Sequence, residues 1–278
     1  MRKMFFILMI LIVGIFLFFA TRDKQPIGNV SDIVLYNNWK NPTFLSVNSD
    51  KWEDGAYITG DGSILYFVIY HGDLLRDILA GSLKGEIDVY QSRKPFTSKS
   101  KVPISEKTWA EGGVMISGND MYYMSNKYAQ DGKYDTDIYK NGVRMSFSTS
   151  EDEDDPHYCA ARDELYFWKK DNGDSNIYVY SNNEIKKLPN PINTASNDIQ
   201  PFLTTNCQEM WFTSDREGNS RIYHSFRNGD TWGEVHLRAS STYGVGEPTL
   251  TDDEKYLFFV KIDFKDGKHD SNIIRAER

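Results

Sequence analysis

The sequence has little cysteine, a single long apolar run, and none of the short motifs that mark several enzyme classes. Its 278 residues include 2 cysteines and 5 histidines. No His-x-x-x-His or Cys-x-x-Cys spacing is present, so we expect no zinc site. There is no Gly-x-Ser-x-Gly segment and no Walker loop, which argues against a serine hydrolase and a nucleotide-dependent enzyme. From these absences we expect neither a cofactor nor a bound metal.

Basic residues are fewer than acidic ones. The chain has 32 lysines and arginines against 40 aspartates and glutamates, which gives a net charge of -8. A basic stripe is the electrostatic footprint of a protein that binds duplex nucleic acid, and none is visible. We therefore expect no nucleic-acid partner. With 40% hydrophobic and 14% aromatic residues, the composition suits one all-β ring with many small core layers.

The apolar run covers residues 4–20 and has basic residues on both sides. Such a segment is an export signal or a membrane anchor. Cleavage after Ala20 would place Phe18 where a signal peptidase requires a small residue, which favours an uncleaved anchor. We expect residues 1–21 to form a hydrophobic N-terminal helix and residues 22–30 a linker. The rest of the chain would then lie outside the cytoplasm, tethered to the membrane, or secreted or periplasmic after cleavage.

One sequence unit recurs five times along the remaining chain. In each unit an acidic or turn-forming cluster runs into a glycine or proline, and an apolar strand, a polar turn and an aromatic strand follow. The anchors are Gly55, Gly113, Pro156, Pro201 and Pro248, spaced by 58, 43, 45 and 47 residues. Periods in the forties with several strands per unit are typical of propeller blades. We therefore predict a five-bladed β-propeller over residues 31–278.

Each unit supplies strands for a four-stranded antiparallel blade. The second strand is aromatic, as in residues 165–168, and the third carries a β-branched residue, usually before a tyrosine, as in residues 221–223. The fifth unit has no fourth strand before Arg278. Residues 39–45 resemble the outer-strand segment 232–237 of the fourth unit. We therefore predict that residues 42–48 form the outer strand of the last blade and close the ring, which hides both sheet edges.

The two cysteines lie at different places in their units. Cys159 is three residues past its anchor, within a strand, whereas Cys207 is six residues past its own, in a turn. Because equivalent strands of neighbouring blades run side by side, this offset predicts sulfur atoms at different heights. A bridge needs Cα atoms within roughly 7 Å of each other. We therefore expect two separate thiols rather than a disulfide.

Several segments carry a likeness to a known repeat. They are the acidic-x-Pro anchor, the aromatic strand, the turn Ser-Asp-Arg-Glu-Gly-Asn at residues 214–219 and the following Arg-Ile-Tyr. Together they resemble the TolB-type propeller repeat, a relative of the WD repeats, most clearly over residues 198–278. The resemblance implies an exported or envelope propeller with binding or scaffolding roles and no obligatory catalytic residues. Gly55 and Gly113 depart from the proline of the pattern, which leaves their blades open to functional specialisation.

Acidic residues gather at one mouth of the predicted channel. The loops that lead into the inner strands meet there, together with the hairpins between second and third strands. A ring of carboxylates focuses negative potential and can bind a cation, a basic protein partner or a glycan, although turn chemistry alone also selects short acidic residues. The candidate ligand-binding residues are Glu53, Asp54, Glu111, Asp154, Asp155, Asp198 and Glu247, with Trp52 and Trp109 as stacking faces.

The first unit carries the one clear insertion, between Tyr70 and Ile87. Leu74, Leu75, Ile78 and Leu79 recur at helical spacing, and Asp73 is placed to cap a helix. We predict a short helix beside the acidic mouth, as a lid, a docking element or a packed cover on the first blade.

Two functions remain open from the sequence. We favour a binding or scaffold module for a protein or carbohydrate ligand, which is not an enzyme. The alternative is a glycoside hydrolase of the five-bladed arabinanase-like type, in which two carboxyl groups roughly 6.5–9.5 Å apart act as acid and base. Acids recur at the same point of every unit, as the repeat itself would produce, and this weighs against the hydrolase.

Overall fold

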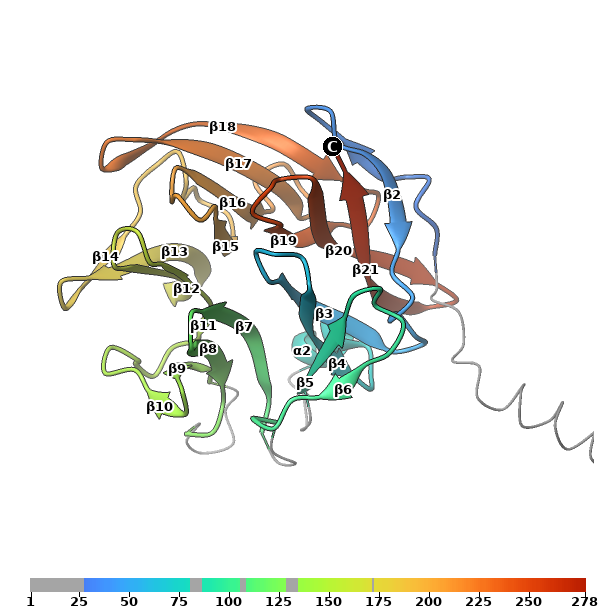
Figure 1. The fold of residues 1–278 in the computed structure, drawn as a ribbon, viewed down its shortest axis with the longest axis horizontal. Coiled ribbons are helices and arrows are strands. Elements are labelled where there is room, and N and C mark those ends of the chain that lie inside the picture. The colour runs from blue at the N-terminus through green and yellow to red at the C-terminus, as the bar shows by residue number, and fades with distance from the viewer. Residues whose placement is uncertain (1–27, 81–86, 106–108, 129–134, 172) are drawn as a thin grey trace, which may run out of the picture.

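The computed structural model describes residues 28–80, 87–105, 109–128, 135–171 and 173–278, which form five antiparallel sheets around a central channel (Figure 1). This confirms the predicted all-β, five-bladed propeller. The predicted apolar helix of residues 1–21 and most of the linker at 22–30 lie outside the described residues. In the described ranges, no helix is long and apolar enough to cross a bilayer.

The first four blades each run from an inner strand at the channel to an outer strand at the rim. Blade 1 consists of β3 (Trp52–Ile58), β4 (Ile64–Tyr70), β5 (Ile87–Arg93) and β6 (Ser100–Lys101). Blade 2 consists of β7 (Glu111–Ser117), β8 (Asp120–Ser125), β9 (Asp137–Lys140) and β10 (Val143–Arg144). Blade 3 consists of β11 (Glu153–Cys159), β12 (Glu164–Asp171), β13 (Asp174–Ser181) and β14 (Glu184–Lys187). Blade 4 consists of β15 (Asp198–Leu203), β16 (Glu209–Ser214), β17 (Arg221–Asn228) and β18 (Thr231–Ser240).

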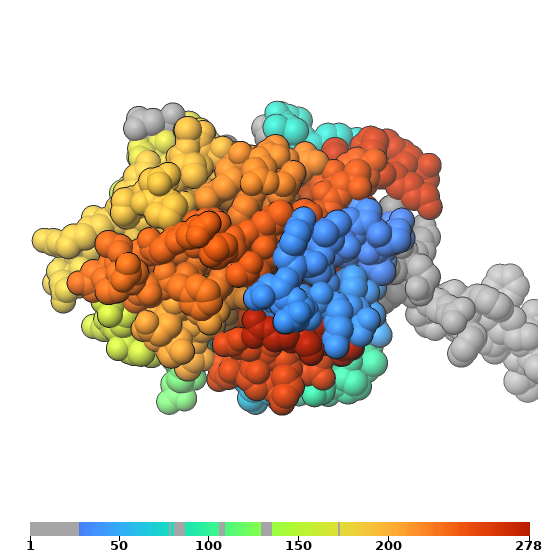
Figure 2. Space-filling view, turned by 90° about the horizontal axis from the view of Figure 1, so that it is seen from above, coloured from blue at the N-terminus to red at the C-terminus, as the bar shows by residue number. Residues whose placement is uncertain are grey.

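Blade 5 is completed by a strand from near the other end of the chain. It contains β19 (Val245–Leu250), β20 (Tyr256–Lys265) and β21 (Lys268–Glu277), and its outer strand is β2 (Lys40–Phe44), antiparallel to β21. The predicted closure is confirmed, with the strand slightly earlier than residues 42–48. In addition, β1 (Val34–Leu35) pairs with β18 as a fifth strand of blade 4, which the sequence did not predict. Figure 2 shows this segment in blue on the outer surface, beside the orange and red strands of blades 4 and 5.

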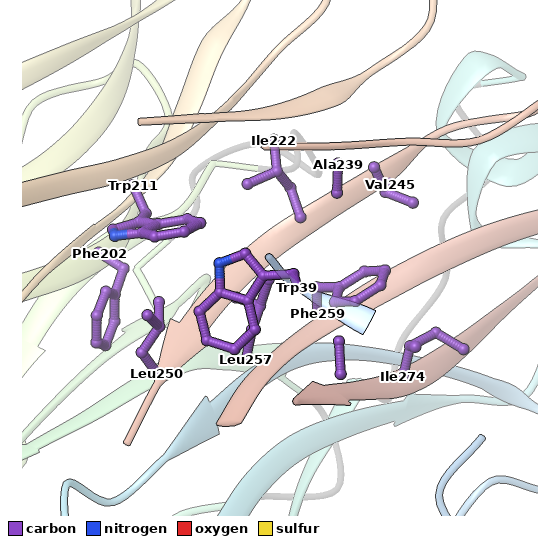
Figure 3. Packing of buried hydrophobic residues seen from close by; sticks show 11 residues of the cluster. Trp39, Phe202, Trp211, Ile222, Ala239, Val245, Leu250, Leu257, Phe259 and Ile274 are labelled. Atoms are coloured by element: carbon purple, nitrogen blue, oxygen red, sulfur yellow. The ribbon is translucent and has the colours of Figure 1, made fainter. Parts of the chain in front are cut away.

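Trp39, between β1 and β2, holds the closing segment in the core. Its side chain is 4% exposed, and its ring meets that of Trp211 edge to face, with centroids 6.1 Å apart. Leu257 and Phe259 of β20 and Ile222 of β17 belong to the same buried cluster (Figure 3). A single indole therefore packs against both blade 4 and blade 5, and burial of its apolar surface stabilises the joint.

Every inner strand carries a β-bulge at the same place, where two residues lie opposite one residue of the second strand. The first residue of each bulge has a positive φ between 48° and 62°; these five residues, which we call the bulge ring, are Gly55, Gly113, Asp155, Gln200 and Glu247. The two glycines therefore correspond to Asp155, Gln200 and Glu247, and not to the prolines that follow them. The anchors predicted for the first two blades were one residue out of register, because glycine and a strained acidic residue can fill the same left-handed position.

Cys159 and Cys207 form a disulfide with their Cα atoms 6.0 Å apart, so the prediction of separate thiols is wrong. Cys159 ends β11, and Cys207 lies in the turn after β15. In that turn the Cys207 N–H donates to the Thr204 carbonyl at 2.7 Å, which folds the chain back to the level of Thr204. Thr204 is three residues past its anchor, as Cys159 is. The two cysteines therefore lie at the same level along the channel although they occupy different positions in their units. The bridge joins blades 3 and 4.

The insertion in blade 1 contains helix α2 (Leu74–Leu79), as predicted. Asp73 Oδ1 accepts a hydrogen bond from the Arg76 N–H at 3.0 Å, the expected cap. Its Oδ2 accepts one from the His269 N–H at 3.0 Å, which ties the insertion to blade 5. Leu74 and Leu75 pack on the core between blades 1 and 2, but Leu79 is 87% exposed, so the predicted apolar stripe is incomplete.

Candidate functional site

The bulge ring encircles the channel near the end where the inner strands begin, which we call the channel mouth. All five of its residues line the channel, one from each blade. For Gln200 and Glu247 a positive φ is unfavourable, since long side chains seldom adopt the left-handed conformation. Such strain persists where the surrounding structure enforces it, and it is most common at functional sites. The inner strands therefore hold these side chains at the channel at a conformational cost.

At the bulge ring and the position before it, acidic residues occur on three of the five blades. Asp54 belongs to blade 1, Asp154 and Asp155 to blade 3, and Glu247 to blade 5. The same two positions carry only glycine on blade 2, and Ile199 and Gln200 on blade 4. We refer to Asp54, Asp154, Asp155 and Glu247 as the mouth carboxylates. The repeat does not impose this distribution, so the argument that the acids merely follow the repeat does not apply to them.

The mouth carboxylates border a cavity of about 350 Å³. We call it the mouth cavity; besides the four carboxylates it is lined by Gly55, Val68, Leu74, Ile87, Gly112, Gly113, Met124, Thr136, Asp152, Trp168, Lys170, Ser175, Ile199 and Gln200. A side chain at Gly113 would press against the backbone of Asp155, since a Cβ there would lie 3.0 Å from the Asp155 Cα. Glycine at this position therefore lets the inner strands of blades 2 and 3 approach each other closely beside the cavity.

Hydrogen bonds from fixed donors orient the mouth carboxylates. The Trp168 indole N–H donates to Asp155 Oδ2 at 2.7 Å, and the Trp52 indole N–H donates to Asp54 Oδ2 at 2.8 Å. Glu247 accepts from the Ala56 N–H and from the Gln200 side-chain amide, both at 2.8 Å. The two oxygens of Glu247 therefore face groups from blades 1 and 4. This site exists only when the ring is closed.

The mouth carboxylates hold protons more tightly than free carboxyl groups do. Burial raises the pKa of Asp54 and raises that of Glu247 well above its usual range, and a side-chain hydrogen bond links the two carboxyl groups. Burial raises the pKa of Asp155 to about 7, and the charge of Asp54 adds to this, against the indole hydrogen bond from Trp168. For Asp154, burial and the neighbouring Asp155 raise the pKa well above its usual range. The empty site therefore carries less negative charge at neutral pH than its four acids suggest.

Three of the predicted acids lie away from the cavity. Glu53, Glu111 and Asp198 are at most 2% exposed and occupy a common position, two residues before the bulge ring. Glu53 bonds to Ser49 and pairs with Lys99 at 3.5 Å, and Asp198 accepts from Arg216 at 2.6 Å. Glu153 fills the same position in blade 3 and contacts Thr149 and Lys169. Glu53, Glu153 and Asp198 tie their inner strands to the loops before them, whereas Glu111 accepts a hydrogen bond from Ser125 of β8 at 3.5 Å. The ligand-binding prediction is kept for the mouth carboxylates.

The predicted tryptophans do not offer stacking faces at the cavity. Trp52 is 2% exposed and uses its N–H to orient Asp54, and Trp109 is half-buried outside the cavity lining. Sequence reasoning missed Trp168 and Thr136, which do line the cavity. Trp168 is the last aromatic residue of the second strand of blade 3. Only its pairing with Asp154 in the blade would have indicated a role at the cavity.

A further ring of side chains, which we call the aromatic layer because three of its five members have rings, lines the channel beyond the bulge ring. It consists of the residues two positions after the ring: Tyr57, Met115, His157, Phe202 and Thr249. The His157 ring lies 4.7 Å from that of Phe202 and 6.4 Å from that of Tyr57. Burial lowers the pKa of His157 to about 4, so it is neutral at physiological pH. A second cavity of about 260 Å³, which includes the disulfide, lies on the other side of this layer.

The acids of the described residues do not make a metal centre. No group of three or more histidine, cysteine, aspartate or glutamate side chains in the described part of the chain has a geometry that could hold a metal ion. The mouth carboxylates are instead satisfied by indole, amide and carboxyl donors. The prediction of no metal and no cofactor stays a prediction.

Comparison with known proteins identifies the fold. No family model matches the sequence, and no curated protein matches it either. A protein described as a TolB from Agrobacterium tumefaciens is similar in structure, with a TM-score of 0.50 and 12% identity over 82% of this chain and 84% of that one. TolB from Acinetobacter baumannii has a TM-score of 0.47 and 15% identity over 78% of this chain and 64% of its own length. The xyloglucan-locus protein GH43B of Bacteroides ovatus has a TM-score of 0.52 and 12% identity over 84% of this chain and 54% of that one. The Agrobacterium protein and GH43B thus share this fold, and the chain spans less than two thirds of the length of two of these three proteins.

Proposed function

We propose that this chain is a binding module that takes its ligand in the mouth cavity. The observation that supports the proposal is the convergence of four carboxyl groups from three blades on one cavity of about 350 Å³, a size within the range of small-ligand sites. Polar groups held in fixed places among apolar lining residues set the orientation of a ligand. A protein or carbohydrate ligand that reaches into the cavity with donor groups would bond to the remaining acceptor positions of the carboxylates.

The propeller would act outside the cytoplasm, tethered by the apolar residues 4–20. The disulfide between Cys159 and Cys207 supports this location, because such bridges persist in oxidising compartments and are rare in the cytosol. The apolar run with flanking basic residues supports it independently.

A binding screen tests this proposal. The full-length chain, kept in detergent because of residues 4–20, is screened against plant and microbial polysaccharides and against peptides, with detection of both binding and products. We expect binding without turnover, weakened by Asp54→Asn and Glu247→Gln together. Asp266→Asn is the matched control, since Asp266 is an exposed acid at the mouth end of blade 5 that does not line the cavity. Ligand binding that is unchanged by Asp54→Asn with Glu247→Gln would refute the proposal.

A glycoside hydrolase is the second candidate, and one observation favours it. Asp155 has its pKa raised to about 7, so it keeps a proton near neutral pH as a general acid must, and Asp54 lies close enough to influence that pKa. The fold shared with GH43B is compatible with this chemistry. Glycan turnover that is lost in both Asp155→Asn and Asp54→Asn would establish the hydrolase and replace the binder.

A further inference from the structure

The mouth cavity has two chemically different sides. On the side of blades 1 and 2, Val68, Ile87 and Met124 are at most 7% exposed, and Leu74 of α2 adds to the same apolar wall. The mouth carboxylates line the cavity from three blades: Asp154 and Asp155 from blade 3, Glu247 from blade 5, and Asp54 from blade 1, where it pairs with Val68 at the edge of the apolar wall. Among the described residues that line the cavity, Lys170 at the rim is the one cationic side chain. A ligand that fills this space must therefore be apolar along one part and match acidic groups at the other.

Two donors on the acidic side are already in use within the protein. The indole N–H of Trp168 and the amide of Gln200 are already used on Asp155 and Glu247. Thr136, which lines the cavity, is 0% exposed, and its Oγ1 has no hydrogen-bond partner within the described part of the chain. A buried hydroxyl without a partner is costly, and its presence beside a cavity points to a polar group of a ligand.

An ammonium group matches the acceptors that these residues offer. It carries three donors, no acceptor and a positive charge, and in lysine it stands at the end of a flexible apolar stem. The stem would lie along the wall made by Val68, Ile87 and Met124, while the charged end replaces the proton that Asp54 and Glu247 share. A sugar fits less well, because the hydroxyls on its far side would be left without partners against that wall.

We propose that the mouth cavity binds a primary ammonium group on an apolar stem, supplied either by a small alkylamine or by a lysine side chain of a protein partner. The inference rests on the proposed function and specifies its ligand. Binding brings one positive charge and displaces carboxyl protons from the Asp54 and Glu247 pair. The cavity releases protons when the amine enters.

Other titratable groups face the cavity and set the pH range of the effect. Asp154, Asp155 and Asp152 of blade 3 add negative charge as they ionise, and Lys170 opposes the ligand at the rim. His157 lies below and stays neutral. Affinity should therefore rise from about pH 6 to pH 8, as the carboxyls lose their protons more easily and the amine, with a pKa of about 10.4 for lysine, stays charged.

The test compares isosteric pairs of probes by isothermal titration calorimetry on the full-length chain in detergent. Butylamine is compared with butanol, and N-acetyl-lysine amide with its Nε-acetylated counterpart. We expect each amine to bind at least about tenfold more tightly than its neutral partner, equivalent to about 1.4 kcal/mol. The observed binding enthalpy should change with the ionisation enthalpy of the buffer, because the buffer takes up the protons that the cavity releases. Tighter binding of butylamine points to a free small molecule, and tighter binding of the lysine derivative points to a protein partner.

Variants locate the binding. Asp54→Asn with Glu247→Gln should lower amine affinity at least about tenfold, whereas Asp266→Asn should leave it unchanged. Thr136→Val, which keeps the shape of the side chain, is the second variant and should weaken binding without altering the melting temperature. Equal binding of butanol and butylamine, or amine binding that survives the paired substitution, would overturn the inference. A neutral ligand that binds and needs Asp54 and Glu247, while butylamine does not bind, would overturn it and leave the proposed function standing.

Discussion

Glu247 of blade 5 and Asp54 of blade 1, the next blade in the closed ring, are linked by a side-chain hydrogen bond between their carboxyl groups. The Ala56 N–H donates to Glu247 beside it, and the Ile58 N–H donates to Thr249 further along the same pair of inner strands. The candidate site and the closure of the propeller are therefore one piece of structure. Loosening the joint should separate the two carboxyl groups.

The raised carboxyl pKa values predict that stability falls as pH rises. Asp155 has a usual pKa of 3.8 and a folded-state pKa of about 7, and Glu53 shifts from 4.5 to about 7. Each group favours the folded state fully below its unfolded pKa and loses that contribution as pH rises through about 7, by up to about 1.4 kcal/mol per pH unit. The melting temperature should drop between pH 5 and pH 8, and Asp155→Asn should flatten the slope. A profile for Asp155→Asn that is parallel to that of the wild type would contradict this assignment.

Removal of the disulfide should lower stability without affecting the mouth. The bridge closes a loop between residues separated by 48 positions, and loss of a bridge of this kind costs about 2–4 kcal/mol. Cys159→Ser with Cys207→Ser should lower the denaturation midpoint, as reductant should in the wild type. Because the aromatic layer lies between the bridge and the mouth cavity, ligand affinity should not change. An unchanged midpoint in both experiments would show that the bridge contributes nothing to stability.

Trp39 should be a critical residue for closure. Trp39→Ala removes the indole that packs on Trp211, and loss of a buried tryptophan costs about 3–5 kcal/mol. Tyr36→Ala is the matched control from the same segment, since Tyr36 is 40% exposed. Urea denaturation should separate the two variants clearly. If Tyr36→Ala were as damaging as Trp39→Ala, the closing segment would not depend on the buried indole.

The buried acids two residues before the bulge ring, such as Asp198, should contribute to stability and not to ligand binding. Arg216→Ala leaves Asp198 buried without its cation, which costs about 3–5 kcal/mol. Arg221→Ala breaks a pair with Glu217, which is 53% exposed, and should cost about 1 kcal/mol or less. The difference is measured by denaturation, and ligand affinity is measured beside it. A loss of ligand affinity in a fully folded Arg216→Ala variant would show that Asp198 contributes to ligand binding.

The repeat predicted the blades, the closing strand and helix α2, because hydrophobic period and turn residues act locally. It did not predict which acids reach the channel. Glu53 and Asp54 are neighbours on β3 and both precede the bulge, so the ordinary alternation of side chains turns Glu53 into its loop while Asp54 borders the cavity. The repeat alone did not say which of the two faces the channel. The disulfide was missed for a different reason, since the turn at Thr204 and Cys207 brings Cys207 back along the channel axis to the level of Cys159.

The most direct test of the account is the affinity of the full-length chain for butylamine, measured by calorimetry at pH 8 for wild type, for Asp54→Asn with Glu247→Gln, and for Asp266→Asn. We predict that the paired substitution weakens binding at least about tenfold and that Asp266→Asn binds as the wild type does. Equal affinities in all three proteins, with melting temperatures showing that each is folded, would contradict the assignment of the mouth carboxylates as the binding site.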